Sequence, residues 1–398
     1  MTTALVVGAG VAGPVLAMAL RKAGIEAELF EGGETGADDL GSWLTLQVNG
    51  MDALRAVDAH HVVAGLGFPS RRMRFFSGTG RELGVMSMGD PLPDGTVSHL
   101  MPRGDLYRAL RDEAVARGAE IRFGKRLVGA SRVGDRVRAE FADGTTAEGD
   151  LLVGCDGTRS RLRTVIDPKA PAVRYIPVLN VGGYVPDFPL ATPSDEFQMM
   201  FGKRCFFGWS ATPDGGVAWF ANPPRRDEPG PGVLSAMTDA DWRSWLLDLL
   251  AVDRSPACDI VRAAPGPLFG WATFDIPRVP TWHRDRMIVI GDAAHATSPA
   301  AGQGASMAIE DAVVLARCLR DLPVDEALAV FEAQRRERVE AVVKAGKRGS
   351  SQKAAGPVGR VVRDALMPLM LRHVDRKGGV SPDWLHRHHI EWDAPVTV

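Results

Sequence analysis

The most informative segment of the sequence is ALVVGAGVAGPVLAMALRKAG at residues 4–24, followed by IEAELFE at residues 25–31. Ala4–Val7 is a short aliphatic run that predicts a strand, and apolar residues after the glycine-rich turn recur at helical spacing. Glu26–Glu31 predicts a second strand. This order is typical of the opening unit of a dinucleotide-binding domain, so the sequence predicts an α/β fold.

Gly8, Gly10 and Gly13 have the Gly-x-Gly-x-x-Gly spacing of a dinucleotide-binding turn and lie between a strand and a helix. Glycines there let backbone amides approach a pyrophosphate at the helix N-terminus, and Glu31 stands where an acidic side chain binds ribose hydroxyls. The alternative is a glycine-rich turn that only packs the strand against the helix. The context favours a bound dinucleotide.

Composition and charge exclude several classes of protein. The 47 Lys and Arg against 49 Asp and Glu give a net charge of -2, so no nucleic-acid partner is expected. Ala4–Leu20 carries no charge, but its glycines and Pro14 favour strand, turn and helix over a membrane span. The four cysteines show neither metal-site spacing nor disulfide density, which fits a reducing cytoplasm.

The middle of the chain has a different character. From about Arg174 to Pro267 aromatic-rich strands predominate, and Cys205–Thr212 and Val217–Asn222 predict a hairpin across the loop at residues 213–216. Thr238 predicts the cap of a covering helix. We therefore expect a separate sheet here, followed by C-terminal helices.

Two later blocks carry further functional signals. Gly154–Arg163 follows a predicted strand, and its alternative interpretation is an Asx turn before a solvated basic helix. The second block, Gly291–His295, follows another buried strand and leads through Pro299 to Gly302-Gln303-Gly304 at the start of a helix. The N-terminus of that helix would place partial positive charge against an anion.

In this order and spacing, the three blocks resemble the single-component (group A) FAD-dependent monooxygenases with the para-hydroxybenzoate hydroxylase fold. The resemblance covers about residues 1–345. It implies an FAD-binding Rossmann-like domain with an inserted β-sheet substrate domain and C-terminal helices. The expected parts are an FAD-binding domain at 1–70, 99–173 and 268–346, a substrate-binding sheet domain at 71–98 and 174–267, and a helical tail at 347–398.

The resemblance also implies site residues. The three glycines would hold the FAD pyrophosphate and Glu31 the adenosine ribose, while Pro299 would border the isoalloxazine ring. One departure is that no basic residue lies between Glu31 and Arg55, where Asp38 and Asp39 stand instead. The residues implied to bind FAD are Gly8, Gly10, Gly13, Glu31, Arg103, Asp156, Gly157, Asp292, Pro299, Gly302, Gln303 and Gly304.

The implied activity is that of an FAD-dependent monooxygenase in which the flavin carries the chemistry and no side chain need be the nucleophile. NADH or NADPH would donate hydride from a groove near Asp156–Arg163, and O2 would form a flavin C4a-hydroperoxide. One oxygen atom would then hydroxylate or epoxidise a small aromatic or polycyclic substrate, in a monomer or homodimer. A halogenase or reductase of the same fold and a non-catalytic flavin-binding regulator are alternatives, although the halogenase motif Trp-x-Trp-x-Ile-Pro is absent from the sequence.

The hairpin supplies the expected substrate residues. Period-2 alternation across a loop at 213–216 places Phe207, Trp209, Phe220 and Asn222 on one face, which we predict to wall the substrate pocket. The alternative is that these aromatic residues pack against a covering helix.

Three clusters are assigned no chemistry. His295 is expected to be structural. Arg335, Arg336 and Arg338 predict an exposed helix face. His386, His388 and His389 indicate a solvated tail, and no metal site is expected.

Overall fold

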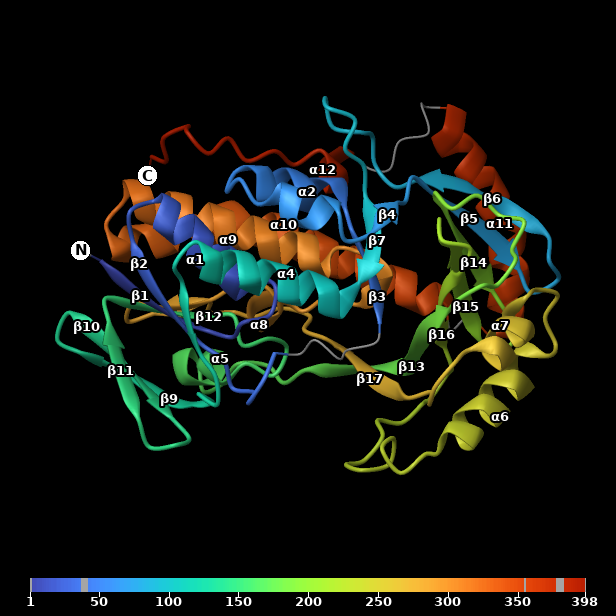
Figure 1. Cartoon of the computed structure of the whole chain (residues 1–398), viewed down its shortest axis with the longest axis horizontal. Coiled ribbons are helices and arrows are strands. Elements are labelled where there is room, and N and C mark those ends of the chain that lie inside the picture. Colours follow the sequence, from blue (N-terminus) through green and yellow to red (C-terminus); the bar gives the residue numbers. More distant parts are fainter. Residues whose placement is uncertain (1, 37–41, 354–355, 377–382, 398) are drawn as a thin grey trace.

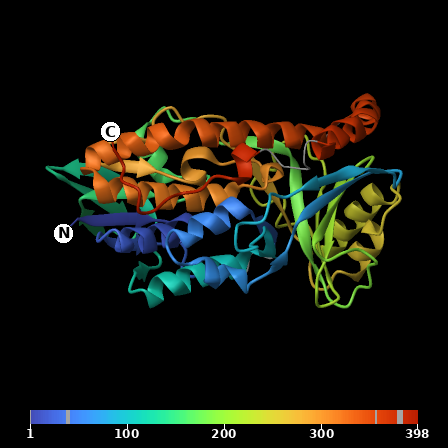
Figure 2. The same ribbon diagram turned by 90° about the horizontal axis from the view of Figure 1, so that it is seen from above.

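The computed structural model describes residues 2–36, 42–353, 356–376 and 383–397, so Asp38 and Asp39 lie outside the described residues. The chain forms two lobes, each built around a sheet, and the long helix α10 (Val324–Lys353) runs from one to the other (Figures 1 and 2). None of the described helices is both long and apolar enough to cross a membrane.

The first lobe contains the predicted opening unit. β1 (Thr3–Val7) pairs in parallel with β2 (Glu26–Phe30) on one side and with β12 (Leu151–Gly154) on the other. A buried, aliphatic β1 at the centre of a parallel sheet explains its continuous apolar sequence. The six strands in spatial order are β18 (His283–Arg284), β19 (Met287–Val289), β12 (Leu151–Gly154), β1 (Thr3–Val7), β2 (Glu26–Phe30) and β8 (Glu120–Arg122).

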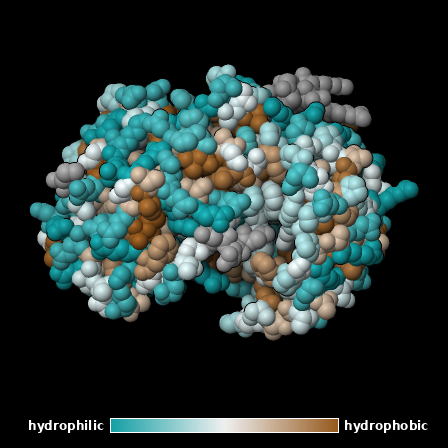
Figure 3. Space-filling model, in the orientation of Figure 1, coloured by the Kyte–Doolittle hydropathy of each residue, from teal (hydrophilic) through white to brown (hydrophobic). Residues whose placement is uncertain are grey.

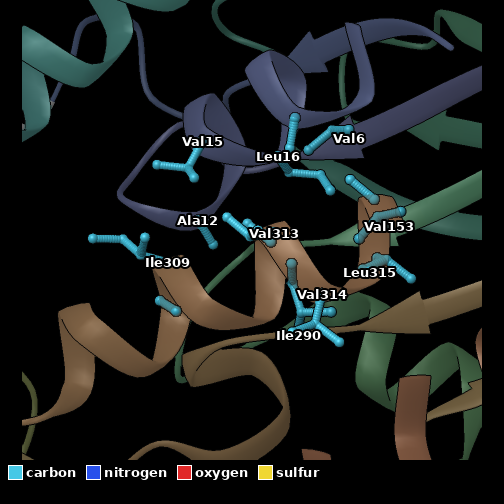
Figure 4. Close-up of a cluster of buried hydrophobic side chains, with 14 of the residues drawn as sticks. Val6, Ala12, Val15, Leu16, Val153, Ile290, Ile309, Val313, Val314 and Leu315 are labelled. Carbon is cyan, nitrogen blue, oxygen red and sulfur yellow. The ribbon is translucent and has the colours of Figure 1, made fainter. Parts of the chain in front are cut away.

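Helices α1 (Ala12–Lys22) and α9 (Gly304–Asp321) pack together beside this sheet. Figure 4 shows Ala12 and Val15 of α1 lying close to Ile309 and Val313 of α9, and all four side chains are buried. Burial of such a contiguous aliphatic cluster is the main favourable term for this lobe. It also brings the N-termini of the two helices, where orphan amides lie, into one structural unit.

Smaller elements complete the first lobe. α2 (Val48–Arg55) packs against α9, and α4 (Arg103–Ala116) packs against α1. α5 (Arg161–Ile166) contacts both β9 (Leu127–Val133) and β19. The additional strands are β11 (Thr146–Gly149), β10 (Arg136–Phe141) and β9 (Leu127–Val133) in one sheet, and β3 (Trp43–Leu46), β7 (His99–Pro102) and β4 (Phe68–Pro69) in another. The helices are α2 (Val48–Arg55), α3 (His60–Ala64), α4 (Arg103–Ala116), α5 (Arg161–Ile166), α8 (Asp292–His295) and the 3-10 turn η1 (Pro299–Ala301).

The second lobe is a seven-stranded sheet with α6 (Asp239–Leu250) and α7 (Ala257–Ala263) on one face. Thr238 caps α6 in a capping box with Asp241, as the sequence predicts. β17 belongs to this sheet, although the predicted division assigns residues 268–346 to the FAD-binding part; the division itself stays a prediction. The strands in order are β17 (Gly270–Asp275), β13 (Arg174–Val185), β16 (Val217–Asn222), β15 (Phe206–Ala211), β14 (Glu196–Phe201), β5 (Arg72–Ser77) and β6 (Glu82–Ser87).

The β15–β16 hairpin is present, but its predicted register is wrong. Phe207 pairs with Ala221 and Trp209 with Trp219, so these side chains share the face under α6. Phe220 and Asn222 lie on the opposite face. The loop spans 212–216 rather than 213–216, and a shift of one residue moves every side chain of a strand to the other face.

The remaining helices follow α10. α11 (Pro357–Arg376) packs along β6, and α12 (Asp383–His386) contacts α2. The last described residues therefore return to the first lobe, close to α9 and α10.

Candidate functional site

The glycines of the loop serve two different purposes. A Cβ on Gly8 would lie 2.2 Å from the Cys155 carbonyl oxygen, and one on Gly13 would lie 2.0 Å from the Gly8 carbonyl oxygen. By contrast, a Cβ on Gly10 would meet nothing within 4 Å. Gly8 and Gly13 are needed for close packing within the protein, whereas the backbone at Gly10 is left open for a ligand to approach.

The N-terminus of α1 is suited to an anion. It has no side-chain cap and no acidic residue in its first turn. Glu31 lies beside the loop because the Ala9 amide donates to one of its carboxylate oxygens at 2.8 Å and the Gly33 amide to the other at 2.8 Å. The remaining lone pairs of a carboxylate held in this way can accept ribose hydroxyls.

Arg103, Asp292 and Gly304 come together from distant parts of the chain. The Arg103 guanidinium donates to the Tyr107 hydroxyl at 2.6 Å. Burial would lower the pKa of Arg103, but Tyr107 and the Asp292 carboxylate together raise it. A Cβ on Gly304 would lie 4.0 Å from an Asp292 carboxylate oxygen. The structure therefore gathers these three predicted FAD residues at the start of α9.

The entry to α9 is a second uncapped helix N-terminus. η1 ends at Gly302, whose φ of 61° is in the left-handed region, and α9 has no acidic residue in its first turn. Gln303 is buried, and its side-chain oxygen accepts from the Asn49 amide at 3.0 Å. Sequence reasoning missed Asn49, since only the fold places α2 against α9.

Together these features fit an FAD molecule. The open backbone at Gly10 and the orphan amides of α1 suit a pyrophosphate, and the N-terminus of α9 suits a second site of negative charge. Both helix ends belong to one packed unit, so an extended dinucleotide can reach both.

The Asp-Gly block has a clear local role. Asp156 accepts from the amides of Arg161 at 2.7 Å and Leu162 at 3.1 Å, at the start of α5, and Ser160 caps the same helix. Its second oxygen is buried and accepts no hydrogen bond in the described structure. Burial raises the pKa of Asp156, although the hydrogen bonds to its carboxylate lower it. The Asx interpretation thus accounts for this side chain, and Gly157 adopts a positive φ of 74° beside it.

Arg163 joins the Asp-Gly block to the Gly-Asp block. It is buried and donates to the Ala293 carbonyl at 2.9 Å and to the Thr158 carbonyl at 3.0 Å. Arg161 donates from the surface to the Val128 carbonyl. Arg159 is exposed, with its guanidinium 5.3 Å from the centre of the Phe274 ring.

Arg159 and Phe274 line an open groove of about 460 Å³ beside β17. The rest of its wall is formed by Glu228, Pro229, Gly230, Gly232, Leu234, Ser235, Phe269, Gly270, Trp271 and Ala272. Figure 3 shows that the surface is hollowed between the two lobes. The groove combines aromatic faces, glycine backbone and one cation next to the Asp-Gly block.

A buried charge network lies behind α9, where an exposed helix face was predicted on α10. Arg335 is 1% exposed and donates to Asp311 at 2.7 Å and to Glu310 at 2.8 Å, while Arg338 donates to Glu310 at 2.8 Å. The prediction is wrong for Arg335 and Arg338, because their partners on α9 are too distant in sequence to be recognised. Arg336 remains partly exposed between Glu332 and Glu340.

The histidines of the two clusters border this network. His295 lies 2.5 Å from Asp311; burial would raise the pKa of Asp311, but His295 and Arg335 lower it to about 2. His386 is buried and His388 approaches Glu310 at 3.8 Å, so the predicted solvated tail is wrong for these two residues. His389 is exposed. Among the described residues, no group of three potential ligands could hold a metal ion.

The predicted substrate residues separate into two groups. Phe207 and Trp209 pack in the core under α6, as the packing alternative states. Phe220 lies on the other face and packs against Phe197. Trp43 and Tyr184 belong to the same cluster, with their ring centres 5.7 Å apart. Asn222 on that face accepts a hydrogen bond from Lys353, a residue that sequence reasoning did not consider.

Comparison with known proteins agrees with this geometry. Residues 1–346 match the FAD binding domain family. The chain is 30% identical over 352 residues to the FAD-dependent urate hydroxylase of Klebsiella pneumoniae, covering 87% of this chain and 89% of that protein. It is also 30% identical over 373 residues to the aurachin C monooxygenase/isomerase of Stigmatella aurantiaca, covering 92% and 94%.

A solved structure has the same fold. Klebsiella pneumoniae HpxO complexed with FAD and uric acid superposes with a TM-score of 0.84 at 24% identity, covering 95% of this chain and 96% of that one.

Proposed function

The chain belongs to the FAD binding domain family, among the single-component FAD-dependent monooxygenases of the para-hydroxybenzoate hydroxylase fold, and from this we propose its reaction in detail. It hydroxylates a small aromatic or heteroaromatic ring, takes electrons from NADH or NADPH, and takes the oxygen atom from O2. Bound FAD would supply the electron transfer and the activation of oxygen.

The observation that carries this proposal is the presence of two uncapped helix N-termini on packed helices, α1 and α9, with the open backbone of Gly10 at the first. The glycine loop would bind the pyrophosphate, Glu31 the ribose, and Arg103 with Asp292 the segment between them. Gly302 and Gln303 would face the flavin ring, and the N-terminus of α9 would hold the negative charge that the ring gains on reduction.

The groove beside Arg159 is the best candidate for the hydride donor. Phe274 and Trp271 offer faces on which a planar ring can stack, and Arg159 offers a cation for a phosphate. Weak contacts suit a donor that must arrive and leave in every turnover. Arg159→Ala should raise the Michaelis constant for NADH or NADPH, and an unchanged constant would place the donor elsewhere.

Cofactor binding can be tested with two glycines of the same loop. Gly10→Val should fold but bind FAD at least about tenfold more weakly, because its side chain enters the open space by the backbone. Gly13→Ala should reduce the yield of folded protein, since its Cβ clashes with a backbone oxygen. If wild type and Gly10→Val bind FAD with equal affinity, the glycine loop is not part of the FAD site.

The reaction itself is tested with purified, FAD-loaded protein. NADH or NADPH should bleach the flavin without O2, and a panel of aromatic substrates should identify one that accelerates bleaching. With O2, mass spectrometry should find a product heavier by one oxygen atom. Bleaching with release of hydrogen peroxide alone, for every substrate, would indicate a reductase or oxidase.

A further inference from the structure

The C-terminal end of α10 joins the two lobes at the proposed flavin ring. A Cβ on Gly349 would lie 3.2 Å from the Cβ of Ala300 in η1, and the Ser350 hydroxyl is hydrogen-bonded to that of Ser298. Lys353 follows one helical turn after Gly349. Figure 1 shows this end of α10 reaching the large sheet near β15 and β16.

Lys353 meets the face of the sheet opposite α6. Its ammonium donates to the Asn222 side-chain oxygen at 2.9 Å, and lies 4.2 Å from the centre of the Phe206 ring and 5.2 Å from that of Phe220. Asn222 is itself fixed, because its amide nitrogen donates to Asn180 at 2.5 Å. A polar chain thus holds the cation over two aromatic faces.

Lys353 has few polar partners in the part of the chain that the structure describes. No described carboxylate forms an ion pair with it, and of the three hydrogen bonds that an ammonium can donate, one is made to a described residue, Asn222. Burial lowers the pKa of Lys353 to about 7. An ammonium in such a place is unfavourable unless an anion arrives, since rings and a neutral amide replace little of its hydration.

The surroundings of Lys353 match one kind of ligand. Phe206 and Phe220 offer apolar, planar contacts, and Lys353 offers a charge, so a ring bearing an anionic oxygen would satisfy both. The ligand would lie beside η1, where the flavin ring is placed in the proposed function.

We propose that Lys353 is a specificity-determining residue that binds the anionic oxygen of an aromatic substrate, a carboxylate or an ionised ring hydroxyl, and so orients the ring toward η1. This inference rests on the proposed function and names its substrate class: acidic aromatic compounds. Lys353 acts by binding and orientation, and no bond to it is formed or broken.

The test measures binding to the FAD-loaded full chain, so it does not depend on turnover. The probes are ring-matched acids and amides, salicylate with salicylamide and 4-hydroxybenzoate with 4-hydroxybenzamide, together with urate as an acid without a carboxylate. Dissociation constants come from the change in flavin absorbance and from calorimetry. The variants are Lys353→Met, which keeps the length of the side chain, Lys353→Arg, which keeps the charge, and Lys344→Met, an exposed control on the same helix.

Wild type and Lys344→Met should bind at least one acid about tenfold or more tightly than its amide, or bind urate. Lys353→Met should lose that preference while binding the amide within about twofold of wild type, and Lys353→Arg should restore part of it. Tight carboxylate binding without urate binding identifies the anion as a carboxylate, and the reverse identifies an ionised ring oxygen.

The proposal is overturned if Lys353→Met keeps the preference, or if wild type binds none of the acids. Failure of the proposed function is a separate result, because it would appear as a protein that binds FAD and acids but never transfers oxygen to a ring.

Discussion

Helix α10 carries two cations, Arg335 and Lys353, whose surroundings differ. Arg335, in its first half, donates to the carboxylates of Glu310 and Asp311, and its side chain is 1% exposed. Lys353, at its end, has a neutral amide and two aromatic rings. Charges that serve the architecture are matched within the protein. A cation such as Lys353, which has no carboxylate partner among the described residues, is better explained by a ligand.

The matched end also has a link to the cofactor. Glu310 accepts from Asn49 at 2.7 Å, and Asn49 donates to Gln303 at the entry to α9. The network around Arg335 therefore positions the helix end that we assign to the flavin ring. Four predictions test the comparison, in order of decreasing effect.

Removing the matched cation should have the largest effect. Arg335→Met removes a cation shared by two buried carboxylates, Glu310 and Asp311, and should lower the free energy of unfolding by about 3–5 kcal/mol. Chemical denaturation measures this, with exposed Arg348→Met as the control, expected within about 0.5 kcal/mol of wild type. A loss below about 1 kcal/mol for Arg335→Met would show that Arg338 and His295 are enough to compensate the charges of Glu310 and Asp311.

Acid should weaken the same end of the molecule. Burial lowers the pKa of His386 and of His388 to about 4, from about 6.5 in the unfolded chain. Between these values the unfolded state binds more protons, so stability is present above pH 6.5 and is lost as the pH falls toward 4. The melting temperature of the wild type should fall by several degrees between pH 6.5 and pH 4. It should fall less in the double variant that carries both His386→Gln and His388→Gln.

His389 provides a control of opposite sign. Its hydrogen bond with Asp52 raises its pKa, so its contribution is present at low pH and lost as the pH rises. His389→Gln should therefore make the loss on acidification larger. If wild type, the His386→Gln/His388→Gln double variant and His389→Gln all lose the same stability on acidification, these histidines are not the origin of the pH dependence.

Adding a carboxylate beside Lys353 should make its surroundings resemble those of Arg335. Asn222→Asp places an anion beside Lys353, so the preference for acidic aromatic ligands should fall by about tenfold although the lysine remains. Calorimetry with salicylate and salicylamide measures the change, and Asn222→Gln separates the loss of geometry from the gain of charge. Acid binding as in wild type would contradict the idea that Lys353 awaits an anion.

Removing the unmatched cation should have the smallest effect on stability. Lys353→Met eliminates a charge that pairs with no described carboxylate and keeps the aliphatic chain, so the free energy of unfolding should change by less than about 1 kcal/mol. The measurement is chemical denaturation beside Arg335→Met. If Lys353→Met lowers the free energy of unfolding by about 3 kcal/mol, Lys353 is a structural residue and does not differ from Arg335 in this respect.

Much of the fold was predictable because its signals are local. The opening strand, turn and helix at residues 3–22 need only an aliphatic run, three glycines and helical periodicity. The capping box at Thr238 likewise involves residues three apart. The implied FAD residues sit at strand and helix ends, which such patterns locate.

The substrate side was not predictable to the same degree. The β15–β16 loop differs from expectation by one residue, and this moves Phe207 and Trp209 under α6 while Phe220 and Asn222 face Lys353. Nothing in the alternation of apolar residues distinguishes these two registers, because both strands are buried on both faces.

Short-range patterns were sufficient for the nucleotide-binding turn, since the conformation of glycine and the exit of a helix from a strand are properties of neighbouring residues. The burial of a charge is different, because it depends on partners that folding brings from elsewhere. Arg335 and Lys353 are both cations on one helix in the sequence. Because its part of α10 packs against α9, Arg335 meets two carboxylates. Lys353 packs against the sheet, where it meets a neutral amide and two aromatic rings.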